Sequence, residues 1–225
     1  MASPKHSVIS PHCDPMVVIH LAQDQPFRVE PGAMVAMTPN VELSSTSPGG
    51  LAGLIDPNAR QRARFQSIYT ARGGPGRLTL APSYSGDIFA MDLDNHTLLV
   101  QSLSFLGCDC DLALNEEVPG GPAFFGREGQ YLVSVSGVGK VLLSAYGGFH
   151  LVQLAEGERY VVDTGHVMAF QSHTRYEVYQ AANQAWLRMV SAESLVCEFE
   201  GPGEVLIQTR NLADLVDDLL PLARA

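Results

Sequence analysis

The triplet Asp163-Thr164-Gly165 is the part of this sequence that most resembles a catalytic motif, because it matches the triplet of aspartic proteases. A single copy could work only in a symmetric dimer, where two aspartates share a proton. A three-residue match needs its structural context, so we expect instead an acidic turn residue that accepts hydrogen bonds from backbone N–H groups. A hydrolase that uses Asp163 and His166 is the minor alternative.

The segment Cys108-Asp109-Cys110-Asp111 could present two thiolates and two carboxylates to a metal ion. Zinc sites normally need a further ligand pair at similar spacing, and Cys13 and Cys197 are isolated. We therefore expect small buried thiols rather than ligands, and the role of Cys108 and Cys110 stays open. The seven histidines form no metal-binding pattern, so no catalytic residue, metal or cofactor is predicted.

Three Gly-x-Gly segments recur along the chain, GPGRLTL (74–80), GVGKVLL (137–143) and GPGEVLI (201–207). None has the third glycine of a dinucleotide-binding loop, and strand-like rather than helical sequence follows each of them. Apolar residues alternate on both sides, which predicts a β-hairpin with one buried face. Glycine tolerates positive φ at such turns. The sequence predicts structural turn glycines at Gly32, Gly74, Gly76, Gly137, Gly139, Gly165, Gly201 and Gly203.

These turns belong to a longer internal repeat. Residues 29–37 resemble residues 162–170, and a looser middle copy runs over 100–107. With the even spacing of the Gly-x-Gly segments, this pattern predicts three tandem β repeats in one all-β unit. We place them at 16–82, 86–147 and 149–210, after an N-terminal extension at 1–15.

One helix is predicted at 211–222. Asn211 can cap it, and Asp214 lies in the first turn, where the helix dipole favours an acid. Apolar residues follow at helical spacing and Pro221 should limit its length. We expect the apolar stripe to pack on the β body; use of the stripe for self-association is the alternative.

The composition excludes several functional classes. The 225 residues carry a formal net charge of −10 and only 14 basic residues, which disfavours binding to nucleic acid. No apolar stretch approaches the roughly 20 residues that cross a bilayer, and no signal-peptide pattern begins the sequence. Four scattered cysteines are too few for a disulfide framework, so we expect a reducing, cytoplasmic compartment.

Apolar residues also stand in glycine-rich connecting segments, where surface exposure is the norm. Such residues would mark an interface with a protein or a membrane surface, or else fold back as lids. The candidate interface residues are Leu51, Leu54, Ile55, Phe124 and Phe125.

Several blocks in order resemble one family. They include EPGAMVAMTPNVEL (30–43), VGKVLLSAYGG (138–148), VVDTGHVMAF (161–170) and GPGEVLIQTRN (201–211). Together they are similar to the altered-inheritance-of-mitochondria twenty-four family, whose bacterial members are often called tryptophan-RNA-binding-attenuator-like proteins. The resemblance implies three β-sandwich-like repeats in a pseudo-threefold arrangement, like the subunit of the attenuator protein, and an oligomer. It supplies no settled activity, and it implies no catalytic residues.

We therefore expect a non-enzymatic, homo-oligomeric scaffold or assembly protein that binds a partner protein or a membrane surface through its loops. The alternative is a small-ligand-binding module with a pocket between β repeats, since pockets commonly form at such boundaries.

Overall fold

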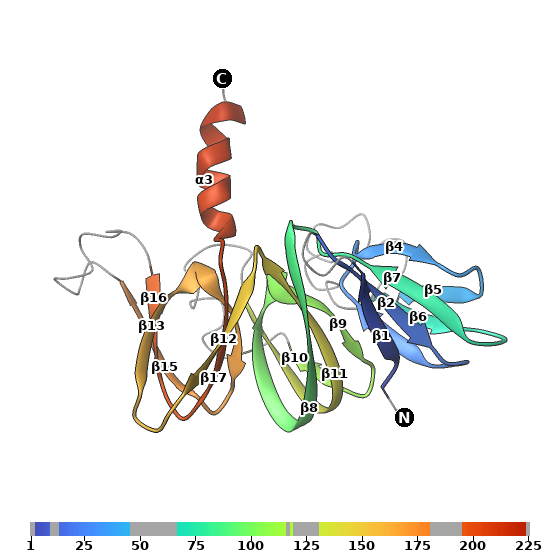
Figure 1. The fold of residues 1–225 in the computed structure, drawn as a ribbon, viewed down its shortest axis with the longest axis horizontal. Helices are drawn as coiled ribbons and strands as arrows, with labels where there is room; N and C mark the ends of the chain where they lie inside the picture. Colours follow the sequence, from blue (N-terminus) through green and yellow to red (C-terminus); the bar gives the residue numbers. More distant parts are fainter. Residues whose placement is uncertain are drawn as a thin grey trace. The chain divides into compact units, whose positions relative to one another are not determined.

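The structure, a computed structural model, describes residues 3–9, 14–45, 67–115, 118, 131–180 and 195–223. Over these residues the chain is all-β with a helix, α3, at its C-terminal end, as expected (Figure 1). The chain divides into two compact units of similar size. Unit 1 comprises 1–94, 105–113 and 137–144, and unit 2 comprises 95–104, 114–136 and 145–225. The expected middle repeat, 86–147, is thus divided between the units.

Unit 1 contains two antiparallel sheets. The first has the strand order β1-β2-β7-β4, and the second has the order β9-β3-β6-β5, with β11 paired to β9. The strands are β1 (Lys5–Ile9), β2 (Met16–Leu21), β3 (Pro26–Val29), β4 (Met34–Met37), β5 (Val41–Ser45), β6 (Ser67–Ala71), β7 (Gly76–Leu80), β9 (Phe105–Asp109) and β11 (Leu132–Tyr146), of which residues 137–144 belong to this unit.

The core of unit 1 is formed by strands in which buried and more exposed residues alternate. Val17, Ile19 and Leu21 of β2 are buried together with Leu78 and Leu80 of β7, while the residues between them are more exposed. Because alternate side chains of a strand point to opposite faces, this alternation gives each strand one buried face.

Unit 2 repeats this arrangement. One antiparallel sheet has the order β12-β17-β14, extended by β8 residues 98–100, and the other has the order β13-β16-β15. The strands are β8 (Gly86–Gln101), of which residues 95–101 belong to this unit, β12 (Phe149–Leu154), β13 (Arg159–Asp163), β14 (Val167–Gln171), β15 (Arg175–Gln180), β16 (Leu195–Glu200) and β17 (Gly203–Gln208). The short strand β10 (Ala113–Asn115) pairs with β11.

An aromatic cluster lies in the core of unit 2. The ring centroid of Phe170 lies 5.1 Å from that of Phe199 and 5.0 Å from that of Tyr176, both in edge-on geometry. Phe170 and Phe199 are fully buried. Edge-to-face contacts of this kind add to the stabilisation that burial alone provides.

The prediction that the Gly-x-Gly segments form hairpins is wrong. The strands β6 and β7 lie in different sheets of unit 1, and β16 and β17 lie in different sheets of unit 2. In both units the glycines therefore carry the chain from one sheet to the other. In the middle copy β11 continues as one strand through Gly137 and Gly139.

The reason for glycine also differs between positions. Gly137 has a φ of 121°, a conformation that favours glycine, but it lies within the strand β11 rather than at the predicted turn. Gly203 is instead required by close packing, because a Cβ there would lie 2.1 Å from Oγ1 of Thr174. Glycine is thus needed at Gly137 for its backbone conformation and at Gly203 because a side chain would not fit.

Three strands share one irregularity of pairing. The register of β4 with β7 shifts at Val35, that of β14 with β17 shifts at Met168, and that of β9 with β11 shifts at Leu106. Each shift has the form of a β-bulge near the start of the strand. The strands that precede β9 and β14 are followed by short 3₁₀ turns, Ser102–Ser104 and Thr164–His166.

The helix α3 (Leu212–Ala223) begins where the sequence predicts, because Oδ1 of Asn211 accepts a hydrogen bond from the Ala213 N–H at 2.9 Å. Pro221 does not end it, and the helix continues to Ala223. We expected the apolar face of the helix to be buried against the β strands. Ala213 is buried, but Val216 and Leu219 are 45% and 51% exposed. No helix in the described ranges is long and apolar enough to cross a membrane.

Candidate interaction surface

The strand β4 is the most exposed apolar element among the described strands. Met34, Val35 and Met37 are 38%, 53% and 41% exposed, and the whole strand lies at the edge of its sheet. Natural edge strands are usually protected by charged residues, proline or a covering segment. The sequence of β4, Met-Val-Ala-Met, contains neither a charged residue nor a proline.

The strands β9 and β14, which have a bulge at the position equivalent to that of β4, are buried. Leu106 in β9 and Met168 in β14 have no exposed surface, whereas Val35 is about half exposed. The difference follows from pairing: β9 is covered on its second edge by β3, and β14 is covered by β8. In the part of the chain that the structure describes, β4 pairs only with β7.

The interface residues predicted from sequence, Leu51, Leu54, Ile55, Phe124 and Phe125, lie outside the described residues. The surface formed by β4 was missed, although its residues belong to a recognised motif. The missing signal was the absence of polar alternation, since four consecutive apolar residues suit a strand covered on both faces.

The segment Cys108 to Asp111 lies at the end of β9, and it is buried at Cys108 and Asp109, partly buried at Cys110 and exposed at Asp111. Cys108 and Asp109 are buried, and burial raises the pKa of the Cys108 thiol to about 12 and also raises the pKa of Cys110. A raised pKa disfavours the thiolate, which is the form of cysteine that binds metals. No group of three or more His, Cys, Asp or Glu side chains that could hold a metal was found among the described residues.

Asp109 has a structural role in unit 1. Its Oδ2 accepts a hydrogen bond from the Lys140 backbone N–H at 2.7 Å and another from the Ser3 hydroxyl. Asp109 thereby links β9 to β11 and to the segment that leads into β1. Its Oδ1 is buried without a hydrogen-bond partner among the described residues.

Lys140 also takes part in a group of ionisable side chains with Asp92 and His6. The ammonium of Lys140 contacts the carboxylate of Asp92, and both groups act on His6 of β1. The pKa of His6 is lowered, first by burial and then by the positive charge of Lys140. Both influences disfavour the charged form of this imidazole.

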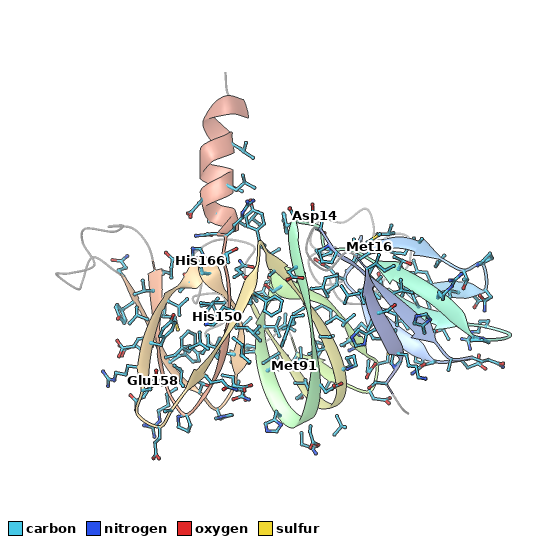
Figure 2. All side chains as sticks on the ribbon, in the orientation of Figure 1. Asp14, Met16, Met91, His150, Glu158 and His166 are labelled. Carbon is cyan, nitrogen blue, oxygen red and sulfur yellow. The ribbon has the colours of Figure 1, made fainter. Side chains whose placement is uncertain are left out.

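The residues of the protease-like triplet and His166 make local structural contacts. Oδ1 of Asp163 accepts the Gly165 N–H at 2.9 Å and caps the 3₁₀ turn. Nδ1 of His166 lies 2.8 Å from the Gln208 carbonyl oxygen. The expectation of an acidic turn residue bonded to backbone N–H groups is confirmed. His150 and His166, labelled in Figure 2, come from different elements, β12 and the 3₁₀ turn.

Known proteins resemble this chain over most of its length. A family model described as Mitochondrial biogenesis AIM24 matches residues 8–210. The uncharacterized protein M6_Spy0233 of Streptococcus pyogenes is 26% identical over 213 residues, which is 91% of this chain and 85% of that protein. The crystal structure of protein SPYM3_0169 from Streptococcus pyogenes has a TM-score of 0.77 at 25% identity, covering 97% of this chain and 99% of that one.

Proposed function

Because this chain belongs to the Mitochondrial biogenesis AIM24 family, we propose that it is a non-enzymatic assembly protein, a homo-oligomeric scaffold that binds a partner through apolar surface. The observation that carries the proposal is the exposed apolar edge strand β4. An exposed apolar edge is a template for association, and proteins keep one where association is the function.

The chemistry of the described residues supports a non-enzymatic role. Asp163 caps a turn, and Asp109 accepts hydrogen bonds from a backbone N–H and a hydroxyl. Burial raises the pKa of Cys108 and of Cys197, so neither thiol is activated as a nucleophile. Each side chain considered for catalysis thus has a structural explanation.

We also propose that the chain consists of three attenuator-like β repeats. The pairing order β2-β7-β4 with β3-β6-β5 in unit 1 recurs as β12-β17-β14 with β13-β16-β15 in unit 2. The bulged pairings of β4, β9 and β14 support a third, middle copy.

Charge favours a protein over a membrane or nucleic acid as the partner. The formal net charge is −10, which repels anionic lipid surfaces and phosphate backbones alike. The described cysteines are free, in keeping with a reducing, cytoplasmic compartment.

Native mass spectrometry tests this proposal. A defined multimer of 24.2 kDa units without added mass is expected. A reproducible added mass that is lost on denaturation would instead favour the ligand-binding alternative. A monomer at every concentration, with no partner in pull-downs, would refute the scaffold.

The glycine-rich loops can be tested separately. The double variant Leu54→Asp, Phe125→Asp should lower partner capture or oligomer mass if these loops contribute. Liposomes with and without anionic lipid, used with the unchanged protein, distinguish a membrane surface from a protein partner. Unchanged mass and capture in the double variant would remove the loops from the interface.

A further inference from the structure

One strand pairing occurs twice in the chain with the same register. In unit 1, β3 pairs antiparallel with β9, and Val29 lies opposite Gly107. In unit 2, β8 pairs antiparallel with β14, and Val100 lies opposite Ala169. In both cases the strand that precedes the bulged strand of one repeat pairs with the bulged strand of the next repeat.

The register is fixed by two independent spacings. Val29 and Val100 are 71 residues apart, as are Ala36 and Gly107. Val100 and Val162 are 62 residues apart, as are Gly107 and Ala169. The residues Ala36, Gly107 and Ala169 also occupy the same place after the bulge, opposite Thr79, Leu142 and Leu206.

This series leaves one strand over at each end. The bulged strand of the first repeat is β4, and the strand that precedes the bulged strand of the last repeat is β13. Within the described ranges, β4 pairs only with β7 and β13 pairs only with β16. Each of them is therefore one half of a pairing that the chain makes twice elsewhere.

The chemistry of both edges suits a further strand. Met34, Val35 and Met37 of β4 are exposed and apolar, and Tyr160 of β13 is 37% exposed. The charge of Arg159 on β13 is neutralised by Glu198 at 3.0 Å and Glu200 at 3.3 Å. Neither edge carries the lysine or proline that commonly blocks the addition of a strand.

We propose that β4 of one copy pairs antiparallel with β13 of a second copy of this chain. The two internal pairings fix the register, which places Ala36 opposite Val162, Met37 opposite Val161 and Thr38 opposite Tyr160. The contact is heterologous, because two different edges meet, so it closes a ring or extends an open chain of copies. This inference rests on the proposed assembly function and names the surface that carries it.

Disulfide trapping between two separately prepared variants tests the register. One carries Met37→Cys and the other Val161→Cys, both in a Cys13→Ser, Cys110→Ser background that keeps the buried Cys108 and Cys197. Opposite residues of antiparallel strands have Cα atoms about 4.5–5.5 Å apart, within the range of a disulfide. Oxidation of the mixture should give a cross-linked dimer, and oxidation of either variant alone should not.

A matched control uses Leu43→Cys on β5 in place of Met37→Cys. Leu43 is 52% exposed and apolar but lies outside the proposed contact, so it should give no cross-link with Val161→Cys. As a second readout, Met37→Asp should lower the oligomer mass in native mass spectrometry, whereas Leu43→Asp should leave it unchanged.

The outcomes separate this inference from the broader proposal. An oligomer that persists without any Met37–Val161 cross-link, and with its mass unchanged by Met37→Asp, refutes the strand pairing and leaves the scaffold standing. An intrachain disulfide in a monomeric chain that carries both cysteines also overturns it, because β13 of the same chain would then cover β4. A protein that is monomeric throughout refutes both.

Discussion

Phe199 offers the strongest test of the packing in unit 2. Its side chain is fully buried, and its ring lies 5.1 Å from that of Phe170 and 6.4 Å from that of Tyr176. Replacement of a buried phenylalanine by alanine removes its burial energy and leaves a cavity, at a cost of about 3–5 kcal/mol. Of this, about 0.5–1.5 kcal/mol comes from each lost aromatic contact.

That cost is a large share of the total stability, since domains are stable by only about 5–15 kcal/mol. For a chain of this size, about 2–4 °C of melting temperature is lost per kcal/mol. Phe199→Ala should therefore lower the melting temperature by about 6–20 °C. Guanidinium unfolding followed by far-UV circular dichroism, with wild type and variant compared at one protein concentration, gives the free energy directly.

The control is Leu43→Ala, because Leu43 is 52% exposed and surface substitutions usually change stability by less than about 0.5 kcal/mol. The core around Phe199 belongs to unit 2, so amide hydrogen exchange should accelerate in β14, β16 and β17 more than in β2 and β7. A loss below about 1 kcal/mol, or equal acceleration in both units, would refute this description of the core.

Three further predictions concern glycine packing, thiol burial and the helix cap. Gly203→Ala should cost about 1–3 kcal/mol, because its Cβ would lie 2.1 Å from Oγ1 of Thr174, whereas Gly148→Ala, with no neighbour nearer than 3.6 Å, should be tolerated in thermal melts. Burial raises the pKa of Cys108 to about 12, while an unfolded thiol titrates near ~8.5. The stability that the buried, protonated Cys108 thiol contributes to the folded state is therefore complete below pH ~8.5. Above that pH it falls by up to about 1.4 kcal/mol per pH unit. Chemical denaturation between pH 8 and pH 10 should show a shallower fall for Cys108→Ala than for wild type, and equal slopes would contradict the burial effect. Asn211→Ala should cost about 1 kcal/mol of helix stability, measured as lost amide protection in α3, and unchanged protection would argue against the cap.

The helix and the strand alternation could be predicted because they depend on local sequence. Asn211, Asp214 and the apolar residues at helical spacing predict a helix at 211–222, and α3 occupies Leu212–Ala223. Leu78 and Leu80, which alternate with polar residues after Gly76, are buried in β7, as predicted for a strand with one buried face. The family resemblance also followed from motifs in the sequence and is confirmed.

Local sequence could not predict whether the two strands joined by a Gly-x-Gly segment pair with each other or lie in different sheets. Alternation on either side of Gly203 indicates two strands, but it does not say whether they pair with each other. Pairing is decided by distant segments, since β17 lies between β12 and β14 while β16 lies between β13 and β15. The close approach of Thr174 to Gly203 likewise arises only when these sheets pack.

The sequence by itself determined that strands flank the recurring glycines and where the helix begins, because these features depend on residues that are near one another in the chain. Only the tertiary structure decided that Met168 is buried and Val35 is exposed, although both lie at the same bulge. The physical reason is that burial of a strand depends on which other strand covers its free edge. That strand is β8 for β14 and β3 for β9, and no residue within β4 encodes its own cover.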